Sequence, residues 1–314
     1  MQTTSKSLAR YYIFITISML FWGMSFIWST IALEYFKPIA LIFFRLVLSS
    51  LILYSYIRIS GSAEKIHKED RRWFFLLALA EPFFYFLGEN FGLLYVSPAI
   101  TSAIIATIPL FSAIVAFILL KEKIEKLTIA GIFISFSGII FMLVNRDLSL
   151  NASLKGILLL FLAVFSAVAY SFFIRKLANK YKAITILTWQ NIIGSLYFLP
   201  LFLIFDLKDV LSSTPSTGSV LAIIQLSIFA SGLAFLLFIV VVAKIGMVKA
   251  NIFTNLIPVF TAVFSYFIIG EIINLQKIVG ILLVVGGIVI SQMPAFVQVY
   301  YRNKQKRELE RTKI

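Results

Sequence analysis

Residues 108–122 read IPLFSAIVAFILLKE and residues 257–271 read IPVFTAVFSYFIIGE, so one pattern occurs twice in this chain. Landmarks of the first copy return 149 positions later: Pro109, Glu122, Gly131 and Gly138 recur as Pro258, Glu271, Gly280 and Gly287. Chance similarity between hydrophobic helices does not account for four Pro, Glu and Gly positions with the same spacing. The sequence therefore predicts an internal duplication.

The composition is that of a polytopic membrane protein. Of 314 residues, 61% are hydrophobic and 13% are charged, and the mean hydropathy is +0.99. Soluble domains contain roughly 45–50% apolar and about 25% charged residues, so an ordinary soluble protein is excluded. A helix that crosses a bilayer needs about 20 apolar residues, which leaves room for about ten spans and little else.

We accordingly predict an all-α polytopic membrane protein with ten transmembrane helices. Long apolar runs bounded by charge, Pro or Gly define the spans. Their approximate limits are 11–33, 39–59, 73–95, 97–120, 127–145, 156–174, 183–205, 218–243, 248–270 and 276–298.

The duplication divides these spans into two sets of five. We expect a first five-helix repeat at 1–147, a second at 148–298 and a basic cytoplasmic tail at 299–314. Because five is odd, the second repeat enters the membrane from the opposite side. Inverted repeats are a recurrent architecture of secondary transporters, whose substrate site lies near the midplane between the halves.

The basic residues indicate the orientation of the chain. Of 28 Lys and Arg residues, 22 fall in segments on the side of the N-terminus and 5 in segments on the other side, while Arg45 lies inside a span. Cytoplasmic loops carry an excess of Lys and Arg. We expect a protein of the cell membrane (inner or plasma membrane) with both termini in the cytoplasm.

Three short motifs accompany this layout: Phe21-Trp22-Gly23 in the first span, Phe44-Arg45 in the second, and Ser97-Pro98-Ala99. With the duplicated Pro-to-Glu stretches, they resemble EamA-type permeases of the drug/metabolite transporter superfamily. The resemblance covers nearly the whole chain and implies a transporter of metabolites or amino acids, although it is poorly specific for substrate. One departure is Tyr170, which lies in the sixth span where many members carry Trp, so aromatic lining there rests on Tyr170.

Arg45 and Glu89 are ionisable residues well inside predicted spans. Such a side chain costs about 2.5–3.5 kcal/mol on insertion scales, so it needs a partner or a watery cavity. Because the two residues lie at similar depth, we predict an intramembrane Arg45–Glu89 ion pair with a structural or gating role. Alternatively, Arg45 extends to the outer interface while Glu89 faces water.

The third span also carries Glu81 and Tyr85, which share one helical stripe with Glu89 at every fourth position. Glu81 is nearer the midplane and has no obvious basic partner. Burial disfavours its charged form, which makes it a candidate proton carrier or a contact for a cationic group. The alternative is a permanently protonated Glu81 that bonds a neighbouring helix. Pro82 removes a backbone donor, so we expect a local distortion there.

Other polar and aromatic residues are candidates for the lining of a substrate cavity, although each alone is more often an interhelical contact than a ligand contact. They are Trp22 and Ser25 in the first span, Tyr170 in the sixth, Trp189 and Gln190 in the seventh, and Asn251 with Asn255 in the ninth, with Gln225 and Ser231 in the eighth as weaker candidates.

Pro109 and Pro258 occupy equivalent positions that we predict to lie in mid-span. A Pro in a helix interior removes a hydrogen bond and kinks the helix, so we interpret the pair as hinges, with static packing kinks as the alternative. Glycines such as Gly131 and Gly280 allow helices to approach closely, which we expect within each half or, alternatively, at a dimer face.

Several classes of function lack their motifs. The chain has no Cys, and its single His lies in a charged loop. Walker, H-E-x-x-H and nucleophile-elbow motifs are absent from the sequence, so we predict no enzyme, no cofactor and no metal site. The net charge of +14 is interpreted as contact with anionic lipid, not nucleic acid.

We therefore predict a secondary transporter that exports small organic metabolites such as amino acids by alternating access. Its expected partners are a small-molecule substrate and the lipid bilayer, and it acts as a monomer or homodimer. The alternatives are a membrane-embedded lipid-modifying enzyme and a channel-like facilitator or scramblase.

Overall fold

The protein is helical throughout the part of the chain that the structure describes. The computed structural model describes residues 5–120, 126–144, 152–178, 180–245, 250, 253–291 and 293, and no β-strand occurs among them. Apolar side chains, rather than polar faces, dominate these helices, as a bilayer requires.

The helices of the first half cover the first five predicted spans. Their bounds are α1 (Ser5–Leu33), α2 (Pro38–Ile59), η1 (Lys68–Asp70), α3 (Arg71–Ala78), η2 (Leu79–Phe84), α4 (Tyr85–Leu93), α5 (Pro98–Ile105), α6 (Ile108–Leu120) and α7 (Lys126–Leu143).

The second half follows the same order. Its elements are α8 (Leu154–Leu177), α9 (Ala183–Leu201), η3 (Phe202–Asp206), α10 (Leu207–Ser212), α11 (Thr217–Gln225), η4 (Leu226–Ala234), α12 (Phe235–Ile245), α14 (Leu256–Ile269) and a final helix, Leu275–Ser291.

Seven helices in the described residues are long and apolar enough to cross a membrane. Three shorter apolar helices lie within the fourth, ninth and tenth predicted spans: Pro98–Ser112, Leu256–Ile269 and Leu275–Ser291. Together they match the ten predicted spans, so the predicted fold class is confirmed.

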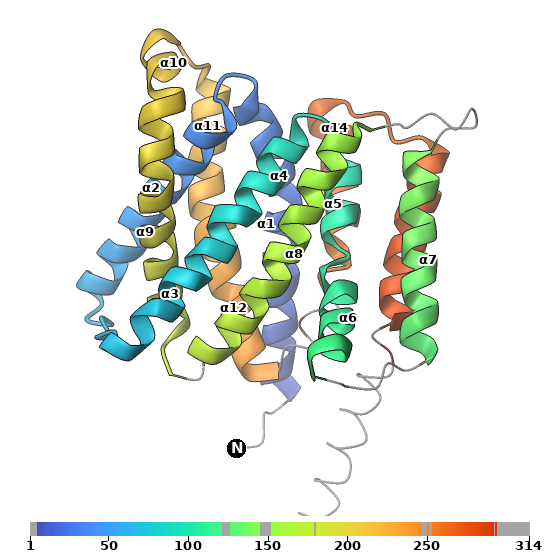
Figure 1. Ribbon diagram of the computed structural model, residues 1–314, viewed down its shortest axis with the longest axis horizontal. Coiled ribbons are helices and arrows are strands. Elements are labelled where there is room, and N and C mark those ends of the chain that lie inside the picture. Colours follow the sequence, from blue (N-terminus) through green and yellow to red (C-terminus); the bar gives the residue numbers. More distant parts are fainter. Residues whose placement is uncertain are drawn as a thin grey trace, which may run out of the picture.

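Helices of the two halves pack in pairs that the duplication relates to one another. α2 packs against α9, its counterpart, and α4 packs against α8 just as α1 packs against the α11–η4–α12 segment. The contact of α1 with α14 likewise matches that of α8 with α5 and α6 (Figure 1). Two copies related by a pseudo-two-fold axis produce this pattern.

α7 and the final helix stand together at one end of the bundle in Figure 1. Their backbones nearly touch, because a Cβ on Gly131 would meet Gly287 and one on Gly138 would meet Gly280. Ser135 Oγ also donates to a backbone carbonyl of the final helix at 3.0 Å. The glycines therefore join the two halves, so our expectation that they pack within each half was wrong.

The prolines expected in mid-span instead begin helical segments. The fourth span breaks at residues 106–107, and Pro109 is the second residue of α6; the ninth is irregular at 254–255, and Pro258 is the third residue of α14. Proline fits the first turn of a helix because its missing N–H has no partner there. Each proline thus follows a break rather than kinking a continuous helix. Whether the breaks act as hinges stays a prediction.

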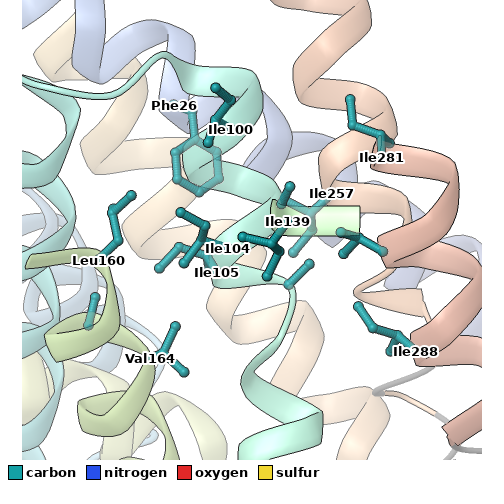
Figure 2. Close-up of a cluster of buried hydrophobic side chains, with 14 of the residues drawn as sticks. Phe26, Ile100, Ile104, Ile105, Ile139, Leu160, Val164, Ile257, Ile281 and Ile288 are labelled. Carbon is teal, nitrogen blue, oxygen red and sulfur yellow. The ribbon is translucent and has the colours of Figure 1, made fainter. Parts of the chain in front are cut away.

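An apolar core fills the space around these breaks. It includes Phe26 of α1, Ile104 of α5, Ile139 of α7, Ile257 of α14 and Ile288 of the final helix, each 6% exposed or less. Figure 2 shows these side chains converging from elements far apart in the sequence. Both halves therefore share one core here.

Polar links also join the halves at the end of the bundle where α1 begins. Asp70 accepts hydrogen bonds from Lys180 Nζ at 2.8 Å and from Tyr181 Oη at 2.9 Å. In the loop before η1, Glu64 accepts a bond from Thr185 Oγ1 at 2.6 Å.

At the opposite end, the loop between α1 and α2 is tied to the segment that follows α9. Lys37 forms an ion pair with Asp209, and the backbone N–H of Ala40 donates to Asp206 at 2.8 Å. Hydrogen bonding and attraction by Asp209 raise the pKa of Lys37 above its ordinary value.

Candidate functional site

Glu81 lies at a break in the helix of the third span. Its backbone is extended (φ −142°, ψ 118°) within the π-helical turn η2 that joins α3 to α4. A residue before proline avoids the helical region because the proline ring clashes with it, and Pro82 follows Glu81 here. The predicted distortion is therefore present, and Glu81 does not sit on the continuous helical stripe that the sequence suggested.

Arg45 of α2 is buried, with 2% of its surface exposed. Its Nε donates to Ser231 Oγ of η4 at 2.5 Å, and its guanidinium carbon lies 4.0 Å above the ring of Phe86. Nη1 lies 3.9 Å from Glu89 Oε2, which is close enough for charge attraction but too far for a hydrogen bond.

Glu89 of α4 is held by its own helix. Tyr85 Oη donates to Oε1 at 3.1 Å, and Asn90 Nδ2 lies 3.5 Å from Oε2. The structure thus brings Arg45 and Glu89 together, but local partners rather than Arg45 hydrogen-bond the carboxylate.

The second half supplies the opposite wall of this cluster. Tyr170 Oη of α8 donates to Gln190 Oε1 of α9 at 3.2 Å, and both residues are buried. The carboxylate of Glu81 lies within electrostatic reach of Tyr170, Arg45 and Glu89. Gln190 also corresponds to Arg45 at the displacement of 145 positions that relates Ser50-Leu51 to Ser195-Leu196. We refer to Arg45, Glu81, Tyr85, Glu89, Tyr170 and Gln190 as the central polar cluster.

Of the two candidates in the first span, one lies among apolar side chains and the other hydrogen-bonds within its own helix. Trp22 is half-buried, with its ring centroid 5.0 Å from those of Phe235 and Phe238, and it contacts all three apolar clusters of the protein. Ser25 Oγ donates to the carbonyl of Trp22 in its own helix at 2.7 Å. Neither side chain is hydrogen-bonded to the central polar cluster.

Trp189 is placed on the outside of the bundle, contrary to the prediction that it lines the cavity. Its side chain is 36% exposed and shares a stripe of α9 with Leu196 and Leu199, whereas Gln190 beside it is 1% exposed. Consecutive helical residues point about 100° apart, which allows Gln190 to face the interior while Trp189 is exposed. In a bilayer this stripe faces lipid.

Of the two candidates in the ninth span, the structure describes one. Asn251 lies outside the described residues. Asn255 precedes α14 at the irregular turn; it is 4% exposed, and neither its Nδ2 nor its Oδ1 has a hydrogen-bond partner among the described residues. Its counterpart in the first half is Ala106.

Residues that the sequence analysis ranked low or passed over complete the cluster. Ser231, a weaker candidate, accepts the hydrogen bond of Arg45, and Asn191 Nδ2 donates to Ser49 Oγ at 3.0 Å. Asn90 contacts Glu89. The available signal was their polarity within apolar spans, but spacing alone does not say which helix face points inward.

A further carboxylate with little exposed surface lies just beyond the C-terminal end of α14. Glu271 receives hydrogen bonds from Ser265 Oγ and from Lys277 Nζ, the latter at 2.8 Å. Burial acts to raise its pKa, but the hydrogen bonds from Lys277 and Ser265 outweigh burial and lower the pKa below its ordinary value. This cluster serves to fix the loop between α14 and the final helix.

The central polar cluster combines two carboxylates, one guanidinium and two phenols inside an apolar protein. In the part of the chain that the structure describes, no group of three His, Asp or Glu side chains is arranged as metal ligands are. The cluster can therefore bind a small polar or charged group and hold or move a proton at a carboxylate.

Comparison with known proteins identifies the chain's family. Residues 9–144 match the EamA-like transporter family, and residues 154–293 match it a second time. The chain belongs to the EamA-like transporter family. The two EamA-like matches lie on either side of the short segment between α7 and α8.

Other EamA-like relatives have similar lengths. An uncharacterized transporter of Archaeoglobus fulgidus is 27% identical over 279 residues, 89% of this chain and 97% of the relative. The uncharacterized transporter YcxC of Bacillus subtilis is 26% identical over 285 residues, 86% and 89% of the two chains. One solved crystal structure has the same fold, with a TM-score of 0.68 and 15% sequence identity. The match covers 92% of this chain and 99% of that chain.

The family is one of transporters, and the relatives are named uncharacterized transporters. The protein is therefore a multi-pass membrane transporter.

Proposed function

We propose that the protein is a secondary transporter that moves small organic metabolites, such as amino acids, out of the cell by alternating access. The observation that carries this proposal is the central polar cluster, which lies buried where the two halves meet. Buried ionisable groups in a membrane are costly, and they mark the paths of substrates and protons.

The two halves supply complementary parts of the proposed site. Arg45, Glu81 and Glu89 come from the first half, and Tyr170 and Gln190 come from the second. Glu81 contacts a cationic group of the solute or carries a proton, while Tyr170 and Gln190 offer a phenol and an amide. A zwitterion with an apolar body suits this mixture of charge and aromatic surface.

Polar links between the halves at both ends of the bundle support alternating access. Asp70 with Lys180 closes the end where α1 begins, and Lys37 with Asp209 closes the other. Lys37 and Asp209 are both exposed, and an exposed ion pair contributes about 0–1 kcal/mol, so that end opens at small cost. At the other end Lys180 is exposed but Asp70 is buried, so opening there must also break the contacts of a buried carboxylate. Rocking of one repeat (1–147) against the other (148–298) would expose the cluster to each side in turn.

The proposed orientation places both termini and the basic tail (299–314) in the cytoplasm of a cell whose inner or plasma membrane holds the protein. Since the chain has no Cys, a single introduced cysteine reports its own side. We expect Thr214→Cys to react with an impermeant maleimide on intact cells and Ser60→Cys to react only after the cells are opened. The reverse pattern would contradict the orientation.

Proteoliposomes test the proposed activity. The purified protein is reconstituted with a trapped amino acid, and entry of the labelled amino acid is followed with chemical analysis of what accumulates. A carrier gives saturable entry that the trapped solute stimulates. Entry that rises linearly without this stimulation would indicate a channel, and a modified product would indicate an enzyme. Protein-free liposomes and Glu81→Gln protein provide the controls.

A further inference from the structure

Arg45 is the most buried charge of the central polar cluster, and one of its donor nitrogens has no hydrogen-bond partner among the described residues. A guanidinium has five N–H groups arranged as a planar fork. Among the described residues, the one hydrogen bond that this guanidinium donates runs from Nε to Ser231 Oγ. Nη1 is buried without a hydrogen-bond partner, and Arg45 as a whole is 2% exposed.

Unsatisfied donors of this kind are rare in proteins because each costs about 1–3 kcal/mol, and more when the group is charged. Glu89 does not resolve the deficit, since its Oε2 is 3.9 Å from Nη1. The carboxylate of Glu89 is instead bonded by Tyr85 and contacted by Asn90, so it does not depend on Arg45 for its partners.

The missing partner can be described from the geometry of the fork. Two parallel N–H groups match the two oxygens of a carboxylate, and such bidentate pairs are among the strongest hydrogen bonds in proteins. Phe86 covers one face of the guanidinium at 4.0 Å, and Ser231 fixes Nε. The orientation of the fork is thus set before any ligand arrives.

Resting on the transport function proposed above, we propose that Arg45 is the carboxylate-binding residue of the transported solute. The solute's carboxylate takes two N–H groups of the fork, including Nη1, and replaces Glu89 as the neighbour of Arg45, while Tyr85 and Asn90 retain Glu89. The transported class is then organic acids and zwitterions, and neutral amides and simple amines are excluded from it.

Matched compounds test this inference on the wild-type protein in nanodiscs. The probes are L-phenylalanine, L-phenylalaninamide and 2-phenylethylamine, L-leucine with L-leucinamide, and 3-phenylpropanoate with its amide. Dissociation constants measured by calorimetry should favour the acid of each set over its amide by at least about tenfold. Equal affinity for acid and amide, or no binding by any acid of the panel, overturns the inference.

Two substitutions locate the contact. Arg45→Lys keeps the positive charge but loses the fork, so it should remove the preference for acids; Arg58→Lys, at the exposed end of α2, should leave the preference unchanged. A preserved preference in Arg45→Lys overturns the inference. If that variant does not fold, the wild-type comparison of acids with amides still decides.

These experiments distinguish failure of this inference from failure of the proposed transport function. Acid-selective binding that depends on Arg45, without movement of any solute in proteoliposomes, would leave this inference standing and contradict the transport proposal. Transport that proceeds equally well for acids and amides, and that Arg45→Lys does not change, would contradict this inference and leave the transport proposal standing.

Discussion

Arg45 Nε of α2 donates a hydrogen bond to Ser231 Oγ of η4 at 2.5 Å, and this bond connects the two halves of the protein inside the membrane. Both residues are buried, with 2% and 1% of their surfaces exposed. A bond from a charged donor to a neutral acceptor in such a place is stronger than an ordinary one. It holds the guanidinium at the junction where the proposed site lies.

Removing the acceptor of this bond should destabilise the protein. Ser231→Ala leaves a further buried donor of Arg45 without a partner, which costs about 1–3 kcal/mol in the free energy of unfolding. Unfolding in mixed micelles measures this change. Ser227→Ala is the matched control, because the Ser227 hydroxyl bonds to the carbonyl of Ile223 in its own helical segment, a local contact whose loss should cost little. An equal decrease in the free energy of unfolding in the two variants would show that the bond to Arg45 stabilises the protein no more than the local bond of Ser227.

Glu81→Gln should abolish proton-dependent transport. The substitution keeps the size of the side chain but removes a carboxylate that can exchange a proton or attract a cation. We expect the initial rate in proteoliposomes to fall by at least about tenfold and the remaining rate to lose its dependence on pH. Glu69→Gln, on exposed η1, should behave as the wild type. A Glu81→Gln protein with an unchanged rate at every pH would favour the alternative of a permanently protonated structural residue.

Two adjacent glycines of the final helix should respond oppositely to a methyl group. A Cβ on Gly287 would meet Ser135 and the backbone of Gly131 on α7, whereas a Cβ on Gly286 has nothing within 4 Å. Overpacking costs about 1–3 kcal/mol, so Gly287→Ala should lower the melting temperature. Gly286→Ala should leave it unchanged or raise it, because Ala favours a helix by about 1 kcal/mol over Gly. Similar losses in both variants would contradict the close contact between α7 and the final helix.

Acid should weaken the loop that Glu271 fixes. Because hydrogen bonds lower the pKa of Glu271 in the folded protein, ionised Glu271 adds stability above its ordinary pKa of 4.5. That stability is lost as the pH falls through the lowered value. Thermal unfolding followed from neutral pH into the acid range should therefore show a smaller loss in Glu271→Gln, which has no ionised form to lose. Glu34→Gln, at an exposed site, serves as the control, and an equal acid loss in Glu271→Gln and wild type would be inconsistent with this role.

The sequence was sufficient for the order of the apolar spans, the distortion at Pro82 and the proximity of Arg45 to Glu89. It failed for Trp189 because lipid and protein interior are both apolar, so hydrophobicity does not say which face of α9 points inward. The Ser231 contact depends on a residue 186 positions away from Arg45 and on the rotation of two helices, neither of which spacing reveals. A break two to four residues before a proline is not visible in an apolar run of sequence. The glycines indicate close packing, but the sequence does not say which helix they pack against.

Access to position 190 tests the central claim most directly, because Gln190 lies in the proposed transport site and Trp189 beside it faces outward. In a chain without cysteine, Gln190→Cys and Trp189→Cys provide a matched pair for a water-soluble, charged thiosulfonate reagent. We predict that Gln190→Cys reacts from both sides of the membrane during transport and that the solute protects it, while Trp189→Cys stays unreactive in lipid. A Gln190→Cys protein that transports normally and never reacts from either side would contradict a solute path between the two halves.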